Sequence, residues 1–358
     1  MKSYSIVMLP GDGIGPEVSE AALEAAQKAG AKHGIRFETS FHVMGGASID
    51  AHGTPLADAA LDAAKAADAV FLGAVGGPKW DELTGDMRPE SGLLALRKGL
   101  QVYANLRPVK VYPAFHPYSP LKSELLDGVD IMVVRELTGG LYFGQPKGPG
   151  QTDAGRRMAV DTMRYDEVEI RRIAKTGFEL ARQRRKRLSS VDKANVLASS
   201  RLWRDVVNEL SADYPDVELE HVLVDNCAMQ LLRRPADFDV IVTENMFGDI
   251  LSDEAAMLSG SIGLLPSASI GDKGGLYEPV HGSAPDIAGT GKANPLAAML
   301  SMVMMMRITL GEPEAADALE QAINQTIAAG HRCADLAGSS ETAPLSTREM
   351  TDEVLKRI

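Results

Sequence analysis

Short apolar runs alternate with longer stretches of helical periodicity along most of this chain. Ala69–Gly73 (AVFLG) and Val129–Val134 (VDIMVV) show little polar alternation, which is typical of strands that are covered on both faces. The order of the elements predicts an α/β protein with a largely parallel sheet. Further strands are expected at Tyr4–Leu9 and Val240–Thr243, and helices at about Pro16–Ala31, Asp166–Arg187, Ser199–Leu210, Phe247–Leu258, Pro295–Leu310 and Pro313–Ala329.

Length and charge narrow the class of protein. The 358 residues suggest two domains, at roughly 150 residues each. With 45% hydrophobic and 24% charged residues, the composition is that of a globular protein and excludes a disordered chain or a collagen. The formal net charge of −12 argues against binding to nucleic-acid phosphates or to an anionic membrane surface. We therefore expect neither a nucleic acid nor a membrane as partner.

The cysteines and the longest apolar run bear on location. Cys227 and Cys333 are the only cysteines and form no CxxC pair, which argues against a disulfide framework and a zinc site. The run Leu296–Met306 is too short to span a bilayer and predicts a buried helix. The apolar N-terminal run stops at Pro10, too early for a signal peptide. Together these features favour a reduced, cytoplasmic protein.

Two segments allow more than one interpretation. Arg182–Arg187 (RQRRKR) looks like a nucleic-acid or localisation signal, but it also falls at the end of a predicted helix. Cations there complement the helix dipole, so we favour a solvated helix end. Gly144–Gly155 (GQPKGPGQTDAG) is rich in glycine and proline, which fits either a linker or a protruding arm.

The first glycine-rich segment, Gly11–Pro16 (GDGIGP), follows a predicted strand and precedes a predicted helix. A dinucleotide-binding turn occupies this place in many α/β proteins. Its fingerprint GxGxxG requires glycine at position 16, where this chain has proline, a residue typical of the first turn of a helix. We therefore interpret the segment as a tight strand-to-helix turn in preference to a pyrophosphate cradle.

Three aspartates are candidate metal ligands. Asp249 and Asp253 are four residues apart on a predicted helix and therefore share a face. Like charges at this spacing destabilise a helix by about 0.2–0.5 kcal/mol, and a divalent cation would offset the repulsion. Oxygen ligands favour Mg²⁺ or Mn²⁺ over Zn²⁺. A third carboxylate, Asp225, follows Leu219–Val224, at the end of a strand where α/β sheets commonly place ligand groups.

Three arginines are candidates for binding an acidic substrate. Arg97 follows a helical run of leucines, Arg107 precedes Pro108 in an extended stretch, and Arg135 ends the VDIMVV strand. A guanidinium binds a carboxylate with two parallel hydrogen bonds. Three of them beside a metal would suit a small dicarboxylate, although any one alone is an ordinary ion-pair residue.

A stiff, irregular loop is predicted at Glu278–Gly289 (EPVHGSAPDIAG), and the segment continues to Asn294 and Pro295. Its prolines and glycines leave backbone N–H groups free of regular structure. Such a loop can hold an adenine and phosphates without a Rossmann turn, whereas composition alone favours a surface connection.

Read together, these segments closely resemble the β-decarboxylating dehydrogenases, that is, the isocitrate/isopropylmalate dehydrogenase family. The match begins at Gly11 and covers nearly the whole chain, and so many ordered motifs make a chance match very improbable. The motifs are GDGIGPE, RPESGLLALRK (Arg88–Lys98), NLRP (Asn105–Pro108), RELTGGLYFGQPK (Arg135–Lys147), VDKANVL (Val191–Leu197), VDNCAMQL (Val224–Leu231), NMFGDILSDE (Asn245–Glu254), EPVHGSAPDIAG and SSETAP (Ser339–Pro344).

The resemblance implies a two-domain α/β fold of non-Rossmann type, with a mixed sheet spanning the domains. The first domain is expected at residues 1–102 and 259–358 and would carry both termini and the NAD-binding loops. The second, at 103–258, would carry the arm, the dimer contacts and the metal-binding aspartates. The resemblance also implies a homodimer, or a pair of dimers, in which Lys193 and Asp225 reach the neighbouring site across the interface.

Within this family, the position four residues before the first arginine of the site separates the substrates. Isocitrate-specific members have asparagine there, whereas this chain has Leu93, followed by Leu94. Two leucines offer an apolar patch to an isopropyl group, worth about 2 kcal/mol, while a carboxylate buried there would be desolvated without a partner. Glu90 also matches the isopropylmalate type, and Ser91 matches the isocitrate pattern. We expect 3-isopropylmalate as substrate, in the third step of leucine biosynthesis.

The resemblance implies NAD as the cofactor. In members that use NAD, an aspartate at the position of Asp286 binds both adenosine ribose hydroxyls, and its charge would repel the 2′-phosphate of NADP. Glu90 and Glu278 would lie near the nicotinamide. The residues implied to bind the cofactor besides Asp286 are Glu278, His281, Gly282, Ser283, Ala284, Ile287 and Asn294.

The implied reaction is an oxidative decarboxylation. The three arginines hold the carboxylates of (2R,3S)-3-isopropylmalate, and Asp249, Asp253 and the partner's Asp225 hold Mg²⁺ or Mn²⁺ as a Lewis acid. Lys193 takes the hydroxyl proton, hydride passes from C2 to NAD, and CO₂ leaves the resulting 2-keto acid. Tyr142 supplies the proton that completes 4-methyl-2-oxopentanoate.

Rival functions remain open at this point. A tartrate or D-malate dehydrogenase, or a broad 3-alkylmalate enzyme, is an alternative because two leucines do not exclude loose specificity. A metal-dependent decarboxylating lyase without redox chemistry would have no need of the adenosine-binding loop. A non-enzymatic interaction protein would leave the aspartates and arginines unused.

Overall fold

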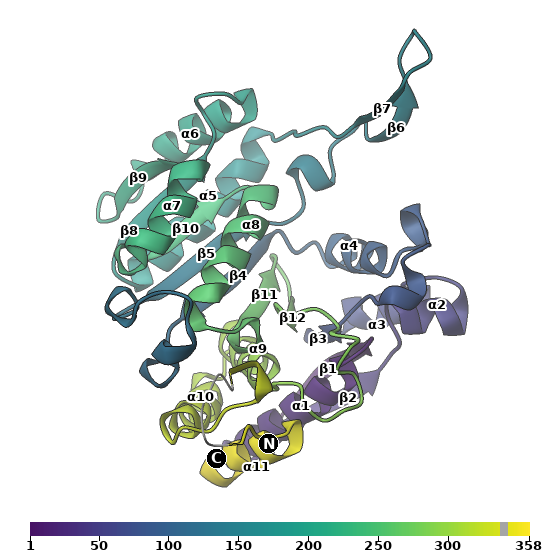
Figure 1. Ribbon diagram of the computed structural model, residues 1–358, viewed down its shortest axis with the longest axis vertical. Helices are drawn as coiled ribbons and strands as arrows, with labels where there is room; N and C mark the ends of the chain where they lie inside the picture. Colours follow the sequence, from purple (N-terminus) through teal and green to yellow (C-terminus); the bar gives the residue numbers. More distant parts are fainter. Residues whose placement is uncertain (337–342) are drawn as a thin grey trace. The chain divides into compact units, whose positions relative to one another are not determined.

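The computed structural model of the protein describes residues 1–336 and 343–358, so residues 339–342 of the SSETAP motif lie outside the described residues. The chain forms two compact units (Figure 1). Unit 1 consists of Met1–Val102, Tyr112–Pro120 and Ser259–Ile358, and unit 2 of Tyr103–Val111 and Leu121–Leu258. Helices alternate with strands in both units, which confirms the predicted α/β class.

Unit 1 is built on five strands in the order β2–β1–β3–β12–β11. Neighbouring strands are parallel except that β11 and β12 form an antiparallel hairpin, so this sheet is mixed. The central strand, β3, is buried along its whole length, as its continuous apolar run predicts. The strands are β1 (Lys2–Gly11), β2 (Ile35–Phe41), β3 (Ala69–Ala74), β11 (Pro266–Ile270) and β12 (Gly275–Pro279).

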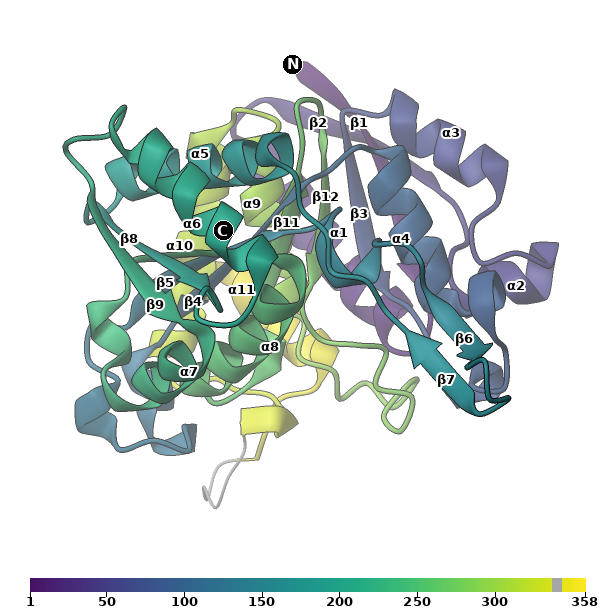
Figure 2. The ribbon, with the colours of Figure 1, turned by 90° about the horizontal axis from the view of Figure 1, so that it is seen from above.

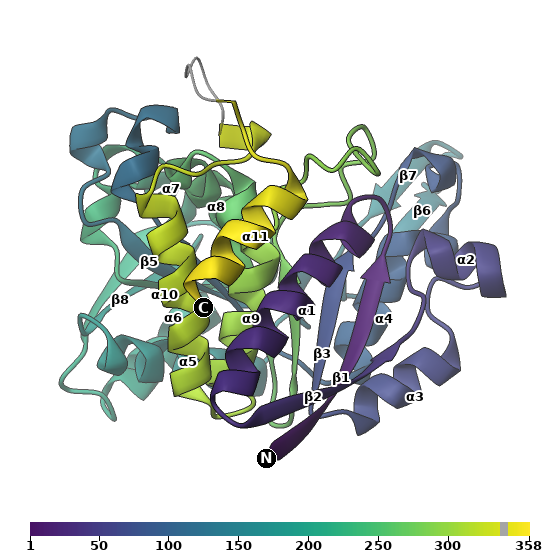
Figure 3. The same ribbon diagram turned by 90° about the horizontal axis from the view of Figure 1, so that it is seen from below.

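Four helices of unit 1 pack together beside this sheet (Figure 3). Helix α1 begins next to Pro16, whose fixed φ suits a first turn, and buries a face of alanines. Helix α9 is buried along Leu296–Met306, as predicted. The four are α1 (Gly15–Lys32), α9 (Leu296–Ile308), α10 (Pro313–Ala328) and α11 (Thr347–Arg357); the others are α2 (Gly46–His52), α3 (Asp58–Ala66) and α4 (Pro89–Gly99). Within the described ranges, no helix combines the length and apolarity needed to cross a membrane.

Unit 2 is also built on five strands, in the order β4–β5–β10–β8–β9. Strands β4 and β5 are antiparallel, and the remaining neighbours are parallel. The carboxyl ends of the parallel strands therefore lie at one edge, where ligand-binding groups are expected in such sheets. The strands are β4 (Ala104–Lys110), β5 (Asp130–Glu136), β8 (Arg187–Asp192), β9 (Glu218–Leu223) and β10 (Val240–Thr243).

The helices of unit 2 form two pairs, in which α5 packs on α6 and α7 packs on α8. Helix α5 starts with a capping box, because Asp166 and Glu169 accept each other's backbone N–H at 3.0 and 2.9 Å. Glu244 caps α8 in a similar way. The helices are α5 (Glu167–Gln183), α6 (Ala198–Ser211), α7 (Val224–Arg233) and α8 (Asn245–Ala256).

The glycine- and proline-rich segment of unit 2 is an arm and not a linker. It contains the two-stranded antiparallel hairpin of β6 (Gly148–Gln151) and β7 (Arg157–Val160), which stands apart from the other strands (Figure 2). Most residues of the hairpin are exposed.

The basic run Arg182–Arg187 lies at the end of helix α5 with most of its side chains exposed, in agreement with the favoured interpretation, but the helix ends earlier than predicted. Helix α5 ends at Gln183, and the run continues through a turn into β8. Arg182 donates to Asp216 at 2.8 Å, and Arg184 donates to the buried Asp239 at 2.9 Å. These ion pairs engage much of the positive charge of the run, because aspartates from distant parts of the chain lie beside it.

Candidate active site

Two arginines on neighbouring strands form the centre of the candidate site in unit 2. Strands β4 and β5 pair Asn105 with Arg135, so Arg107, two residues further along β4, lies on the same face. Both arginines are buried, with 7% of Arg107 and 2% of Arg135 exposed. Arg107 Nε donates to Asn105 Oδ1 at 2.9 Å, which fixes its orientation. The sheet therefore presents two rigid guanidinium groups side by side.

Helix α8 brings two aspartates to these arginines. Arg107 donates to Asp253 Oδ1 at 3.1 Å, and another of its nitrogens lies 3.6 Å from Asp249 Oδ1. Arg135 donates to the same oxygen of Asp249. Because Asp249 and Asp253 are one turn apart, both reach the guanidinium of Arg107. In this structure, therefore, arginine charges offset the repulsion between the two carboxylates.

Tyr142 joins the same cluster from the short 3₁₀ turn Gly140–Tyr142. Its hydroxyl donates to Asp249 Oδ2 at 2.8 Å, and the guanidinium of Arg135 lies 5.6 Å from the centre of its ring. Burial and the bond to Asp249 raise the pKa of the Tyr142 hydroxyl above its ordinary value. Tyr142 is therefore protonated at neutral pH and is available as a proton donor.

The aspartates of this cluster fit a divalent cation as two of its ligands. Across residues 1–336 and 343–358, three or more His, Cys, Asp or Glu side chains nowhere gather in a way that could hold a metal ion. Asp249 and Asp253 nevertheless place carboxylate oxygens around one positive group, and such oxygens are the ligands preferred by Mg²⁺ and Mn²⁺. Burial raises the pKa of Asp253 against the opposing charge of Arg107. A dication would stabilise the ionised form of Asp253 further.

Lys193 and Asp225 pair with each other in unit 2. Lys193 follows β8, Asp225 lies in the first turn of α7, and Lys193 Nζ donates to Asp225 Oδ1 at 2.7 Å. This bond lowers the pKa of the Asp225 carboxyl. The backbone N–H of Lys193 donates to the buried hydroxyl of Ser200 at 3.1 Å, which fixes the chain at this point. Asp225 therefore retains its charge well below neutral pH.

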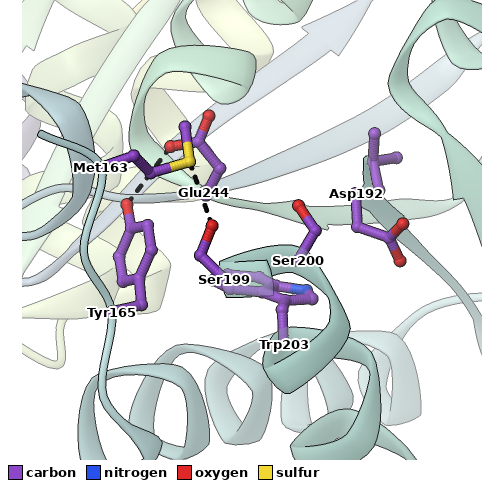
Figure 4. A pocket seen from close by; sticks show the side chains of 8 residues that line it. Met163, Tyr165, Asp192, Ser199, Ser200, Trp203 and Glu244 are labelled. Atoms are coloured by element: carbon purple, nitrogen blue, oxygen red, sulfur yellow. Dashed lines mark hydrogen bonds between the residues drawn. The ribbon is translucent and has the colours of Figure 1, made fainter. Parts of the chain in front are cut away.

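A buried tyrosine, Tyr165, lies beside the carboxylate of Glu244 (Figure 4) and also contacts that of Glu136. The Tyr165 hydroxyl lies 3.2 Å from Glu136 Oε2 and 3.4 Å from Glu244 Oε2, and it accepts the backbone N–H of Asn245 at 3.0 Å. The Asn245 side chain in turn accepts two hydrogen bonds from Arg135, at 2.8 and 3.1 Å. Tyr165 is thus linked to the arginine cluster through the first residue of α8.

The two carboxylates each hold a backbone segment of the site. Glu136, fully buried, accepts the N–H groups of Thr138 and Gly139 at 3.0 and 2.8 Å, just before the turn that carries Tyr142. Glu244 accepts the N–H of Phe247 at 2.7 Å and so caps α8. Sequence reasoning missed this network, because its members are single polar residues within apolar segments and meet only in the folded chain.

In unit 1, the guanidinium of Arg97 forms an ion pair with the carboxylate of Glu278. Arg97 donates to Glu278 Oε1 at 2.7 Å, and both side chains are about one-tenth exposed. Helix α4 carries Arg97 together with Leu93 and Leu94, which are both half-buried. Leu93 packs against the apolar core of unit 1. Glu90, at the start of α4, is exposed.

The loop after β12 combines buried and exposed candidate residues. His281 and Ser283 are buried, whereas Asp286 is exposed. Burial lowers the pKa of His281, so this imidazole is neutral at physiological pH. The amide of Asn294 donates to Asp335 Oδ2 at 3.0 Å, and Asp335 is a further residue that the sequence analysis did not predict. The carboxylate of Asp286 is therefore exposed on a loop whose first residues, His281 and Ser283, are buried.

The two α/β units, and a site made of paired arginines and paired aspartates, fit the class of enzymes that act on small carboxylic acids. The chain belongs to the isocitrate/isopropylmalate dehydrogenase family, whose model matches residues 5–354. It is 57% identical over 354 residues to a 3-isopropylmalate dehydrogenase of Pseudomonas fluorescens, covering 99% of this chain and 98% of that relative. A 3-isopropylmalate dehydrogenase of Aquifex aeolicus is 55% identical over 358 residues, covering 100% and 98%.

Solved structures agree with this assignment. The chain resembles an isocitrate dehydrogenase from Methylococcus capsulatus with a TM-score of 0.88 at 36% identity, over 99% of both chains. A β-decarboxylating dehydrogenase from Thermococcus kodakarensis matches with a TM-score of 0.79 at 33% identity, over 99% of this chain and 96% of that one. The predicted family, fold class and enzyme type, an oxidoreductase of the isopropylmalate branch, are thereby confirmed. The roles of individual site residues stay predictions.

Proposed function

We propose that this chain catalyses the NAD-dependent oxidative decarboxylation of (2R,3S)-3-isopropylmalate to 4-methyl-2-oxopentanoate and CO₂ in leucine biosynthesis. The observation that carries the proposal is the 55–57% identity, over essentially full length, to relatives named 3-isopropylmalate dehydrogenase. The two unpaired buried cysteines, Cys227 and Cys333, support the cytoplasmic location that we also propose.

Substrate binding would use the arginines and the leucine pair. The rigid guanidinium groups of Arg107 and Arg135 suit the carboxylates of a malate, and Arg97 would join them. Leu93 and Leu94 would contact the isopropyl group. Ser91, the one departure toward the isocitrate pattern, donates its hydroxyl to Gly85 O at 2.9 Å, so its proton is already engaged within the chain. This bond supports an alkyl substrate over a third carboxylate.

Proton transfers would fall to Lys193 and Tyr142. Lys193, acting across a homodimer interface, takes the proton of the C2 hydroxyl as the substrate is oxidised. Tyr142, which burial keeps protonated, gives its proton to the carbon that loses CO₂. When bound, the nicotinamide accepts hydride from C2 and a divalent cation polarises the C2 oxygen.

The metal ion and NAD would be bound by different residues. Asp249 and Asp253 would hold Mg²⁺ or Mn²⁺ with the partner's Asp225, because one chain alone supplies only two of these carboxylates to the cluster. The loop after β12 would hold NAD, with the exposed carboxylate of Asp286 on the adenosine ribose. That negative charge supports NAD over NADP, whose 2′-phosphate it would repel.

A single spectrophotometric panel tests the proposal. NADH formation is followed with isopropylmalate, D-malate, tartrate and isocitrate, each with NAD⁺ or NADP⁺ and with or without Mg²⁺. We expect the largest kcat/KM with isopropylmalate, NAD⁺ and Mg²⁺. A larger kcat/KM with tartrate or D-malate would replace the proposed substrate, and equal use of NADP⁺ would contradict the role given to Asp286.

A further inference from the structure

The Gly11–Gly15 turn donates backbone hydrogen bonds to the end of strand β3 and to the loop after β12. Asp12 N–H donates to Ala74 O, at the end of β3, at 2.8 Å. Ile14 N–H donates at 2.8 Å to Ser283 O, in the loop after β12. These two N–H groups are used within the protein, so they are not available to cradle a pyrophosphate. The turn therefore supports other segments.

Asp12 fixes the position of this turn. Its carboxylate is 4% exposed and accepts the backbone N–H groups of Gly46, Ala47 and Gly76, each at 2.8 Å. Three charge-assisted hydrogen bonds from two separate segments hold the turn from both sides. A substitution that adds atoms to this turn should therefore displace the segments packed against the turn, because the turn itself is held in place.

Gly13 lies directly against the loop after β12. Its φ is +59°, and a Cβ atom on Gly13 would lie 2.0 Å from Ser283 O and 2.8 Å from the carbonyl carbon. Both atoms belong to the backbone, so no side-chain rotation can relieve the overlap. Only glycine at this position allows the loop to approach closely enough for the bond between Ile14 and Ser283.

The loop needs such support because its own backbone is strained. Ala284, next to Ser283, has a φ of +38°, in the region that residues other than glycine rarely adopt. The hydrogen bond from Ile14 lies one residue before this position. A contact of this kind can hold a conformation that the loop would not adopt alone.

We infer that the Gly11–Gly15 turn is a positioning element that presets the loop at residues 281–289 for the adenosine half of NAD, with Gly13 providing the close approach and Ile14 the hydrogen bond. The inference rests on the proposed function for the identity of the ligand, but the support that the turn gives to the loop can be measured without any ligand.

The test is Gly13→Ala, with Gly34→Ala as its matched control. Gly34 has a φ of +71°, and no atom lies within 4 Å of the Cβ that alanine would add there. Both substitutions carry the strain of a left-handed alanine, but only Gly13→Ala collides with the loop. We expect Gly13→Ala to raise the KM for NAD⁺ at least about tenfold, with the KM for isopropylmalate within about twofold of wild type. Gly34→Ala should leave both KM values unchanged.

Hydrogen exchange gives a readout that needs no activity. Amides of residues 282–290 should exchange faster in Gly13→Ala than in wild type, and in Gly34→Ala they should not. Equal exchange in the two variants, or equal KM values for NAD⁺, overturns the inference. If Gly13→Ala does not fold, the pair Gly13→Asn and Gly34→Asn repeats both measurements, since asparagine tolerates a left-handed φ better. A wild-type enzyme without NAD⁺ activity would overturn the proposed function, while the exchange comparison would still decide the role of the turn.

Discussion

Replacing Tyr165 by phenylalanine removes one hydroxyl from behind the arginine cluster and leaves the ring in place. That hydroxyl accepts the N–H of Asn245 at 3.0 Å and lies within hydrogen-bond distance of Glu136 and Glu244. It has a single proton, so it donates to one of the two carboxylates at a time. Burial and the nearby charges raise the pKa of Tyr165, which keeps that proton in place.

The size of the effect follows from burial. Asn245 is fully buried, so its N–H would lose its acceptor in a place that bulk water does not reach, at a cost of about 1–3 kcal/mol. The two carboxylates would also lose the donor between them, which adds to this cost. The cavity that Tyr165 and Glu244 line has room for about one water molecule, and a water there would restore part of the loss. We therefore expect Tyr165→Phe to destabilise unit 2 by about 2 kcal/mol.

Urea unfolding followed by tryptophan fluorescence measures this loss, because one of the two tryptophans, Trp203, meets the Tyr165 ring edge-on at 5.8 Å. Tyr214→Phe is the matched control. Tyr214 is as buried as Tyr165, 7% exposed in each case, and the described residues give its hydroxyl no hydrogen bond. Tyr214→Phe should cost less than about 0.5 kcal/mol. Equal losses in the two variants would refute the role assigned to the Tyr165 hydroxyl.

Activity separates a positioning role of Tyr165 from a purely structural one. Asn245 orients Arg135 through two hydrogen bonds, so a shift in the first residue of α8 also moves this guanidinium. We expect Tyr165→Phe to lower kcat/KM for isopropylmalate about tenfold, equivalent to one hydrogen bond, without changing the KM for NAD⁺. A fall in kcat alone, with the KM values for isopropylmalate and NAD⁺ both unchanged, would indicate general loss of folded enzyme.

Three further outcomes are expected. Tyr142→Phe should lower kcat at least about 100-fold with little change in KM, because it removes a general acid; an unchanged kcat would exclude that role. Lys193→Met should abolish NADH formation while the dimer persists in size-exclusion chromatography, and near-normal turnover would rule out Lys193 as the base. Chelation of divalent metal should stop turnover and weaken isopropylmalate binding in calorimetry, and undiminished binding would remove the metal from the substrate site.

The elements of the fold follow closely from the sequence pattern. Val240–Thr243 is a strand with the predicted ends, and α9 is buried along its predicted run, because a continuous apolar segment is stable only when it is covered. The helix predicted to end at Arg187 ends at Gln183 in the structure. Charge at a helix terminus is a weak local signal, whereas the ion pair from Arg184 to Asp239 spans 55 positions and cannot be read from the run itself.

The charged residues of the site could be predicted from the sequence, whereas the buried residues that hold them in position could not. Asp249 and Asp253 signal a shared helix face through their spacing alone, and the structure brings both to Arg107. Glu136 and Tyr165 carry no such spacing, since their meeting depends on how β5 and the segment before α5 come together. Long-range hydrogen bonds between single buried polar groups are specified by the whole fold.

The charges of the cluster explain why one substrate and one cation should bind together. Arg107, Arg135, Asp249 and Asp253 sum to zero and neutralise one another in the unliganded chain. A dicarboxylate alone would draw the two arginines from the aspartates and leave the half-buried Asp249 and the more exposed Asp253 without their partners, which costs free energy. A dication alone would bind the aspartates and leave the two arginines without their carboxylate partners. The malate dianion and the dication together add no net charge, so each should strengthen the binding of the other.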